Sequence, residues 1–178
     1  MPDVDYTTLP ALLPIKLETA LVKWLRAKRG SLMSGVNITG AHEPGVPPVP
    51  WLSVFCRGAH KHPDFAGVTG AHLPKLATLE LSWRVHRELD FQRTASLWSG
   101  QCYELLVNGS AIEAERTPER ANFAGLIADL NPGGILHPSD GLFLYEVTDS
   151  EDSLGYNTTA RIVTFALEIT AQSGDPGT

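Results

Sequence analysis

The sequence predicts an α+β fold, in which a mainly antiparallel or mixed sheet of about four strands packs against two or three helices. Two distant segments alternate apolar and polar residues, which is typical of a strand with one buried face. Their apolar positions are Leu79, Leu81, Trp83 and Val85 in the first segment, and Val163, Phe165, Leu167 and Ile169 in the second. Helical spacing dominates between them, so we expect the sheet to be built from distant parts of the chain.

Three segments favour helices. Residues 15–29 place apolar side chains on one stripe at helical spacing, and Gly30 follows a basic last turn as a stop signal. Residues 91–107 follow Asp90, a suitable N-cap. A shorter helix is expected over 117–130, because its Thr-Pro-Glu opening is typical of a helix start.

Strands are expected over 51–56, 76–89, 142–147 and 159–171. Residues 35–50 are rich in glycine and proline, and we interpret them as an extended connection. Residues 57–75 are expected to form a long loop, or alternatively a flexible hairpin arm. The whole chain, 1–178, is expected to form a single domain with flexible tails over 1–12 and 172–178.

The composition is that of an ordinary globular protein, with 43% apolar and 19% charged residues in a chain of 178. Acidic side chains outnumber lysine and arginine by 20 to 14, so the formal net charge is −6. A mildly acidic chain lacks the electrostatic footprint of a dedicated nucleic-acid binder. We therefore expect no direct recognition of nucleic acid.

Cys56 and Cys102 are the two cysteines of the chain. The first residues carry no basic region followed by an apolar core, and no apolar run approaches the ~20 residues that span a bilayer. These features favour a reducing cytosolic setting with both thiols free, and no membrane association.

A metal-like cluster is formed in the sequence by Cys56, His60, His62, Asp64 and His72. Their spacing matches none of the zinc-ligand patterns, and a polar loop accounts for the histidines. We therefore expect no bound metal and no cofactor.

Nucleophilic catalysis finds little support in the sequence. Neither Ser53 nor Ser99 lies in a Gly-x-Ser-x-Gly elbow. A Cys102–His86 pair stays open, because catalytic groups assemble in space, but a core role for Cys102 is favoured. The expectation is a protein without enzymatic activity.

The order of expected elements resembles that of the tail terminator, or tail-completion, proteins of tailed bacteriophages. The likeness rests on the opening helix 15–29, the proline-led strand 50–56, and the strand 76–89 followed at once by helix 91–107. The Ala/Leu-rich segment 123–131 and the closing hairpin 142–171 complete it. It covers roughly residues 11 to 172 and is a likeness of architecture, without a short sequence signature.

The resemblance implies a homohexameric ring that caps the tail tube, stops its polymerisation and provides the interface for head attachment. The implied partners are other copies of the chain, the tail tube protein and the head–tail connector proteins, and the implied location is the tail–neck region of the virion after assembly in the host cytoplasm. The lumen of such a ring could pass DNA without direct recognition of the nucleic acid. The alternatives are another head–tail connector or minor tail protein, or a stand-alone α+β ligand-binding module.

A ring needs two complementary surfaces on each subunit. We predict that the acidic residues Asp149, Glu151 and Asp152 approach basic residues at the end of the first helix of a neighbour. Those basic residues are Arg26, Lys28 and Arg29. The segment 57–75, with His60, His62 and Asp64, is the second expected contact.

Overall fold

The computed structural model describes residues 12–31, 33–68, 73–86, 91–150, 155–157 and 162–176. Within these ranges the α-helices are α1 (Leu13–Lys28), α2 (Phe91–Asn108) and α3 (Ala124–Leu130). Short 3-10 helices are η2 (Pro63–Phe65), η3 (Glu113–Glu115) and η4 (Pro118–Arg120). The strands are β1 (Asn37–Gly40), β2 (Trp51–Lys61), β3 (Lys75–Arg84), β4 (Leu142–Asp149), β5 (Gly155–Asn157) and β6 (Ile162–Ser173). The predicted α+β class is confirmed.

The strands form one mixed sheet in the order β1-β2-β3-β6-β4, and β5 pairs with the first residues of β6. Strands β1 and β2 are parallel, whereas the other pairs are antiparallel. Leu81 lies opposite Val54 on one side and Phe165 on the other. The two long alternating segments of the sequence are therefore neighbours at the centre of the sheet.

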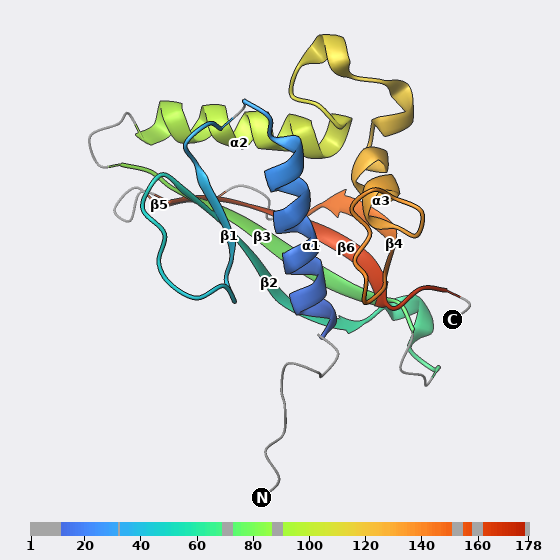
Figure 1. Ribbon diagram of the computed structural model, residues 1–178. Helices are drawn as coiled ribbons and strands as arrows, with labels where there is room; N and C mark the ends of the chain where they lie inside the picture. The colour runs from blue at the N-terminus through green and yellow to red at the C-terminus, as the bar shows by residue number, and fades with distance from the viewer. Residues whose placement is uncertain are drawn as a thin grey trace, which may run out of the picture.

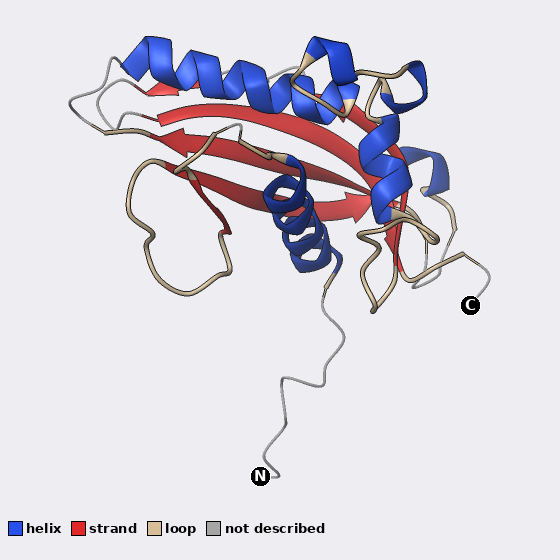
Figure 2. Ribbon diagram, turned by 45° about the horizontal axis from the view of Figure 1, so that its top comes forward, coloured by secondary structure: helices blue, strands red, loops and turns tan. Residues whose placement is uncertain are grey.

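All three α-helices cover the same face of the sheet (Figures 1 and 2). Helix α1 packs on β1 and β2, α2 on β3 and β6, and α3 on β4. The odd-numbered residues of β3 face these helices, and Ala77, Leu79, Leu81 and Trp83 are completely buried. Within the described residues, the other face of the sheet carries no α-helix, and we call it the open face.

Two strands were not expected from the sequence. The Gly/Pro-rich stretch 35–50 contains β1, whose parallel pairing with β2 is supported by a hydrogen bond from Trp51 Nε1 to Thr39 Oγ1 at 2.8 Å. The short strand β5 is the second. The predicted long loop 57–75 is also partly wrong, because β2 continues through Gly58, at φ 145°, and pairs with β3 as a hairpin. The hairpin alternative is therefore the observed one.

Other boundaries also differ from the prediction. Strand β3 ends at Arg84, while Asp90 and the rest of 87–90 lie outside the described residues. The helix expected over 117–130 is divided into η4 and α3, because Asn122 and Phe123 adopt left-handed φ values of 53° and 64°. The C-terminal tail begins later than expected, because Gln172 and Ser173 belong to β6.

Both edges of the sheet are partly covered by side chains. On β1, Arg26 donates to the carbonyl oxygen of Ile38 at 2.6 Å, and Arg29 donates to that of Val36 just before the strand. On β4, the Asn131 carboxamide bonds both the N–H and the carbonyl of Leu144, at 2.7 and 2.9 Å. Covering edge groups in this way disfavours strand-to-strand association.

A buried carboxylate joins the helices to one another. Asp129 Oδ2 on α3 accepts hydrogen bonds from Trp24 Nε1 of α1 at 3.0 Å and from Arg120 of η4 at 2.6 Å. It also forms an ion pair with Lys28 at 3.0 Å. Burial by itself raises the pKa of Asp129, but the hydrogen bonds from Arg120, Lys28 and Trp24 outweigh it and hold the pKa below its ordinary value.

We predict that Asp129→Ala destabilises the fold by about 2–4 kcal/mol, because it leaves a buried indole N–H and two cations without their carboxylate. Urea unfolding at pH 7 measures this loss. Asp64→Ala is the matched control, since the side chain of Asp64 is 82% exposed and we expect a change below about 0.5 kcal/mol. Equal losses for both variants would contradict the assigned role of Asp129.

The same carboxylate predicts a pH dependence. Because the pKa of Asp129 is lower in the folded state, its contribution is complete above the unfolded pKa of about 3.9 and is lost as the pH falls through the folded pKa. The free energy of unfolding should therefore drop more between pH 7 and pH 3 in the natural chain than in Asp129→Asn. Parallel curves for the two proteins would refute the assignment.

Candidate functional site

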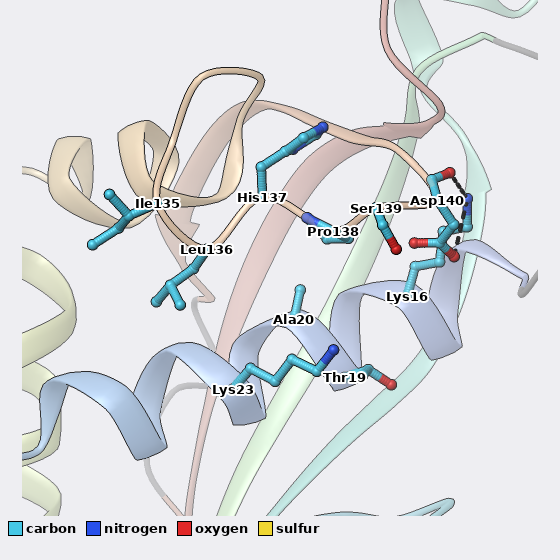
Figure 3. A pocket seen from close by; sticks show the side chains of 10 residues that line it. All are labelled: Lys16, Thr19, Ala20, Lys23, Ile135, Leu136, His137, Pro138, Ser139 and Asp140. Atoms are coloured by element: carbon cyan, nitrogen blue, oxygen red, sulfur yellow. Dashed lines mark hydrogen bonds and ion pairs between the residues drawn. The ribbon is translucent and has the colours of Figure 1, made fainter.

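A groove of about 480 Å³ lies between α1 and the segment 135–140 that follows α3. Lys16, Thr19, Ala20 and Lys23 of α1 form one wall (Figure 3). The other wall comes from the facing segment and consists of Ile135, Leu136, His137, Pro138, Ser139 and Asp140. The volume falls within the roughly 300–1,000 Å³ that binding pockets commonly have.

The sequence Asn131-Pro132-Gly133-Gly134 folds the second wall back onto α3. Gly134 N–H donates to the carbonyl of Asn131 at 2.8 Å, and Leu136 N–H donates to that of Asp129 at 3.0 Å. A Cβ atom at Gly134 would lie 2.3 Å from the carbonyl oxygen of Ala128, so only glycine fits there. The tight return places Ile135 at the rim of the groove, where it is 77% exposed.

Lys16 connects the two walls of the groove at one end through hydrogen bonds and an ion pair. Its side chain is only 4% exposed, and its ammonium group donates to the carbonyl oxygens of Asp140 and Gly141 at 2.8 and 3.1 Å. The carboxylate of Asp140 lies 3.6 Å away and balances the charge. Lys16 therefore has a structural role and offers little charge to a ligand.

His137 is also fully engaged. Its Nδ1 donates to the carbonyl oxygen of Leu130 at 2.7 Å, and its Nε2 lies 3.1 Å from Oδ1 of Asp175. Lys23, in contrast, is exposed and forms no hydrogen bond or ion pair with any residue that the structure describes. The groove thus combines an unpaired cation with the exposed aliphatic side chain of Ile135.

A hydroxyl group and an imidazole, those of Ser139 and His137, line the same groove. Ser139 is the exposed hydroxyl nearest in sequence to His137, but the imidazole has both nitrogens committed elsewhere. General-base activation requires a base within hydrogen-bond reach of the nucleophile. No such pair is present among the described lining residues.

A second buried carboxylate was missed by the sequence analysis. Glu18 on α1, whose side chain is 3% exposed, accepts hydrogen bonds from His42 N–H and Nδ1, both at 2.9 Å, and from Cys56 N–H at 3.3 Å. Strand β1 ends at Gly40, opposite Val54, so Glu18 satisfies the N–H of Cys56 that lies beyond the end of β1. Its signal in the sequence, a single glutamate in an amphipathic helix, is too common to be recognised.

Neither cysteine has the environment of a nucleophile. Burial raises the pKa of Cys56, a hydrogen bond to Gly58 lowers it, and the Glu18 charge raises it further, with a net rise. Cys102 is completely buried, and this burial strongly raises the pKa of its thiol. His86 is exposed, and no interaction with Cys102 accompanies the shift.

The residues of the metal-like cluster are dispersed. Cys56 faces the helices, whereas His60 pairs with Leu76 on the open face. His62 and Asp64 lie at η2, where the N–H of Asp64 donates to Nδ1 of His62, and His72 lies outside the described residues. No three histidine, cysteine or acidic side chains come together as a metal site within the described part of the chain.

The predicted intersubunit residues also have partners within the chain. Arg26 bonds Glu43 as well as Ile38, Arg29 bonds Val36, and Lys28 pairs with Asp129. Asp149 accepts a hydrogen bond from the Tyr103 hydroxyl at 2.7 Å, which raises the pKa of Tyr103 to about 12. Glu151 and Asp152 lie outside the described residues. The predicted contact stays a prediction, and it requires some of these intrachain bonds to be exchanged.

Among the described residues no helix is long and apolar enough to cross a membrane. A scan of the sequence against protein-family models matched no family, and a search of curated proteins matched no relative.

The raised pKa values of the two thiols predict that both cysteines react slowly with thiol reagents. We expect Cys56 and Cys102 to react with a thiol reagent at pH 8 at least tenfold more slowly in the folded protein than in urea, since the thiolate is the reactive form. Mass spectrometry after timed labelling measures both sites. Rapid labelling of either cysteine in the native protein would indicate a reactive thiol instead.

Proposed function

We propose that this chain is a structural protein of the tail–neck region of a tailed bacteriophage, resembling the tail terminators. It assembles as a homohexameric ring that caps the tail tube, stops its polymerisation and provides the head-attachment interface. The order α1, hairpin β2–β3, α2, α3 and closing strands β4–β6 supports the proposal, because it agrees with the resemblance drawn from the sequence.

The observation that carries the proposal is the one-sided packing of the sheet (Figure 2). The open face is left for contact with a neighbouring subunit or the tube. Part of it is polar and internally bonded, through the Arg57–Glu80 ion pair and the Ser82–Thr164 hydrogen bond at 2.9 Å. Phe55, on the same face, stays 40% exposed.

The side-chain cover at the outer edge of β1 also fits a ring. Because Arg26 and Arg29 cover carbonyl groups at this edge, association through side-chain surfaces is favoured over extension of the sheet. A heterologous contact between two different surfaces closes into a ring when its rotation permits. The proposal assigns no catalytic step, which agrees with the protonated state favoured for both thiols.

One observation favours a second candidate. The groove beside α1 has the volume of a ligand pocket, so a stand-alone α+β binding module is the alternative. Another head–tail connector or minor tail protein would share the assembly surfaces but not the capping activity. Tube-end capping in images of purified tail tubes separates the terminator from these roles.

Light scattering over a concentration series, with negative-stain images of the same sample, tests the proposal. We expect particles of six chain masses that appear as rings with a central hole. Phe55→Asp should raise the concentration needed for association by roughly tenfold, because it places a charge on the open face. Leu97→Asp on α2 is the control, since Leu97 is 58% exposed but lies on the opposite side of the sheet.

A chain that stays monomeric, even when tail tubes are added, would overturn the ring. Rings that respond equally to Phe55→Asp and Leu97→Asp would retain the ring but exclude the open face as its contact.

A further inference from the structure

We propose that the groove between α1 and residues 135–140 binds the N-terminal segment, residues 1–11, of a second copy of this chain. The inference rests on the proposed assembly and names a contact that links neighbouring subunits. It concerns a surface distinct from the open face, so the two contacts can be tested separately.

The two walls of the groove differ in chemistry (Figure 3). The wall formed by α1 carries Lys23, exposed and without a partner among the described residues. The facing wall carries Ile135, with 77% of its surface exposed, and the half-buried Leu136. A segment lying between the walls would therefore meet a cation on one side and aliphatic groups on the other.

The N-terminal segment has the matching chemistry in its sequence, MPDVDYTTLPA. It contains Asp3 and Asp5 and no lysine or arginine. Side chains alternate along an extended segment, so binding in that conformation would place Asp3 and Asp5 on one side and Val4 and Tyr6 on the other. Carboxylates would then face Lys23 while apolar groups cover Ile135, as both walls require.

The charge balance of the groove selects an acidic ligand. Lys16 is neutralised by Asp140 and two carbonyl groups, and His137 is held by Asp175. Lys23 is thus the cation of this groove that a ligand can complement. Charge complementarity of this kind contributes mainly to specificity and orientation, while apolar contacts add affinity.

The proposed assembly makes a neighbouring subunit the recipient. Leu12, the N-cap of α1, is 71% exposed, so the chain enters the helix at the surface of the subunit. In an extended bound conformation, eleven residues would span up to ~36 Å, which exceeds the ~24 Å length of the 16-residue helix α1.

Cross-linking between two variants that each carry one added cysteine, beside the buried Cys56 and Cys102, tests the inference on the full chain. Thr7→Cys and Thr19→Cys place thiols in the segment and in the groove, and they leave Asp3, Asp5 and Lys23 unchanged. The two variants are mixed and treated with a short bismaleimide, and we expect a covalent dimer on denaturing gels. Thr7→Cys mixed with Leu97→Cys should give no dimer above background, because Leu97 lies on α2, which does not line the groove.

Charge exchange provides an independent test of the same contact. Asp3→Lys with Asp5→Lys, or Lys23→Glu alone, should lower the dimer yield severalfold, and combining the exchanges in one chain should restore it. Unchanged yield after Lys23→Glu would overturn the role of the charge, since Lys23 has no described partner whose loss could disturb the fold.

The outcomes separate this inference from the proposed function. A cross-link formed only within one chain, when both cysteines are placed together, would overturn exchange between subunits. Absence of any cross-link in samples that form rings would overturn the groove contact and leave the ring intact. A dimer that forms on mixing, in a protein that never forms rings, would support the contact and overturn the hexamer.

Discussion

The fold depends on the way α1 is held against α3 by the carboxylate of Asp129. Trp24 and Lys28 reach this group from α1, and Arg120 reaches it from η4. The backbone of the same residue also accepts the N–H of Leu136, which fixes the return of the chain after α3. One residue thus sets the spacing between α1 and the facing segment, and hence the width of the groove between them.

The constraint on α1 extends to the edge of the sheet. Helix α1 lies on β1 and β2. Its Glu18 can therefore accept the hydrogen bond from the N–H of Cys56, which lies beyond the last residue of β1, and its Arg26 can donate to the carbonyl oxygen of Ile38. Four-residue β1 has few ladder bonds of its own, so these side chains supply part of its stability. The basic end of α1 is therefore used inside the subunit, whereas Lys23 of the same helix has no partner among the residues that the structure describes.

The sequence predicted the centre of the structure well and its margins poorly. Alternation of apolar residues identified β3 and β6, because their buried face is continuous from Ala77 to Trp83 and from Phe165 to Ala171. Strand β1 was missed, because its four residues contain a single large apolar side chain, Ile38, and lie in a stretch rich in glycine and proline. Its stability comes from Thr39 and Trp51 and from α1, which local patterns do not reveal.

The site residues illustrate the same limit on local prediction. A ring needs complementary surfaces on each subunit, and this requirement led to Arg26, Lys28 and Arg29 being predicted as an intersubunit surface. Their observed partners include groups 12 and about 100 positions away in the sequence, so only the tertiary structure identifies them. The buried pair Trp24–Asp129, separated by 105 positions, could not be found for the same reason.

The distribution of charge connects the fold to the proposed assembly. Buried or half-buried carboxylates and cations neutralise one another within the subunit, as in the Lys16–Asp140 and Lys28–Asp129 pairs. Pairs of this kind are costly to separate, so they make poor exchangeable contacts between subunits. An exposed charged group that has no partner within the subunit can bind a neighbour without the cost of separating an ion pair. A surface that combines Lys23 with Ile135 therefore provides a better docking site than the basic end of α1, even though the latter is richer in positive charge.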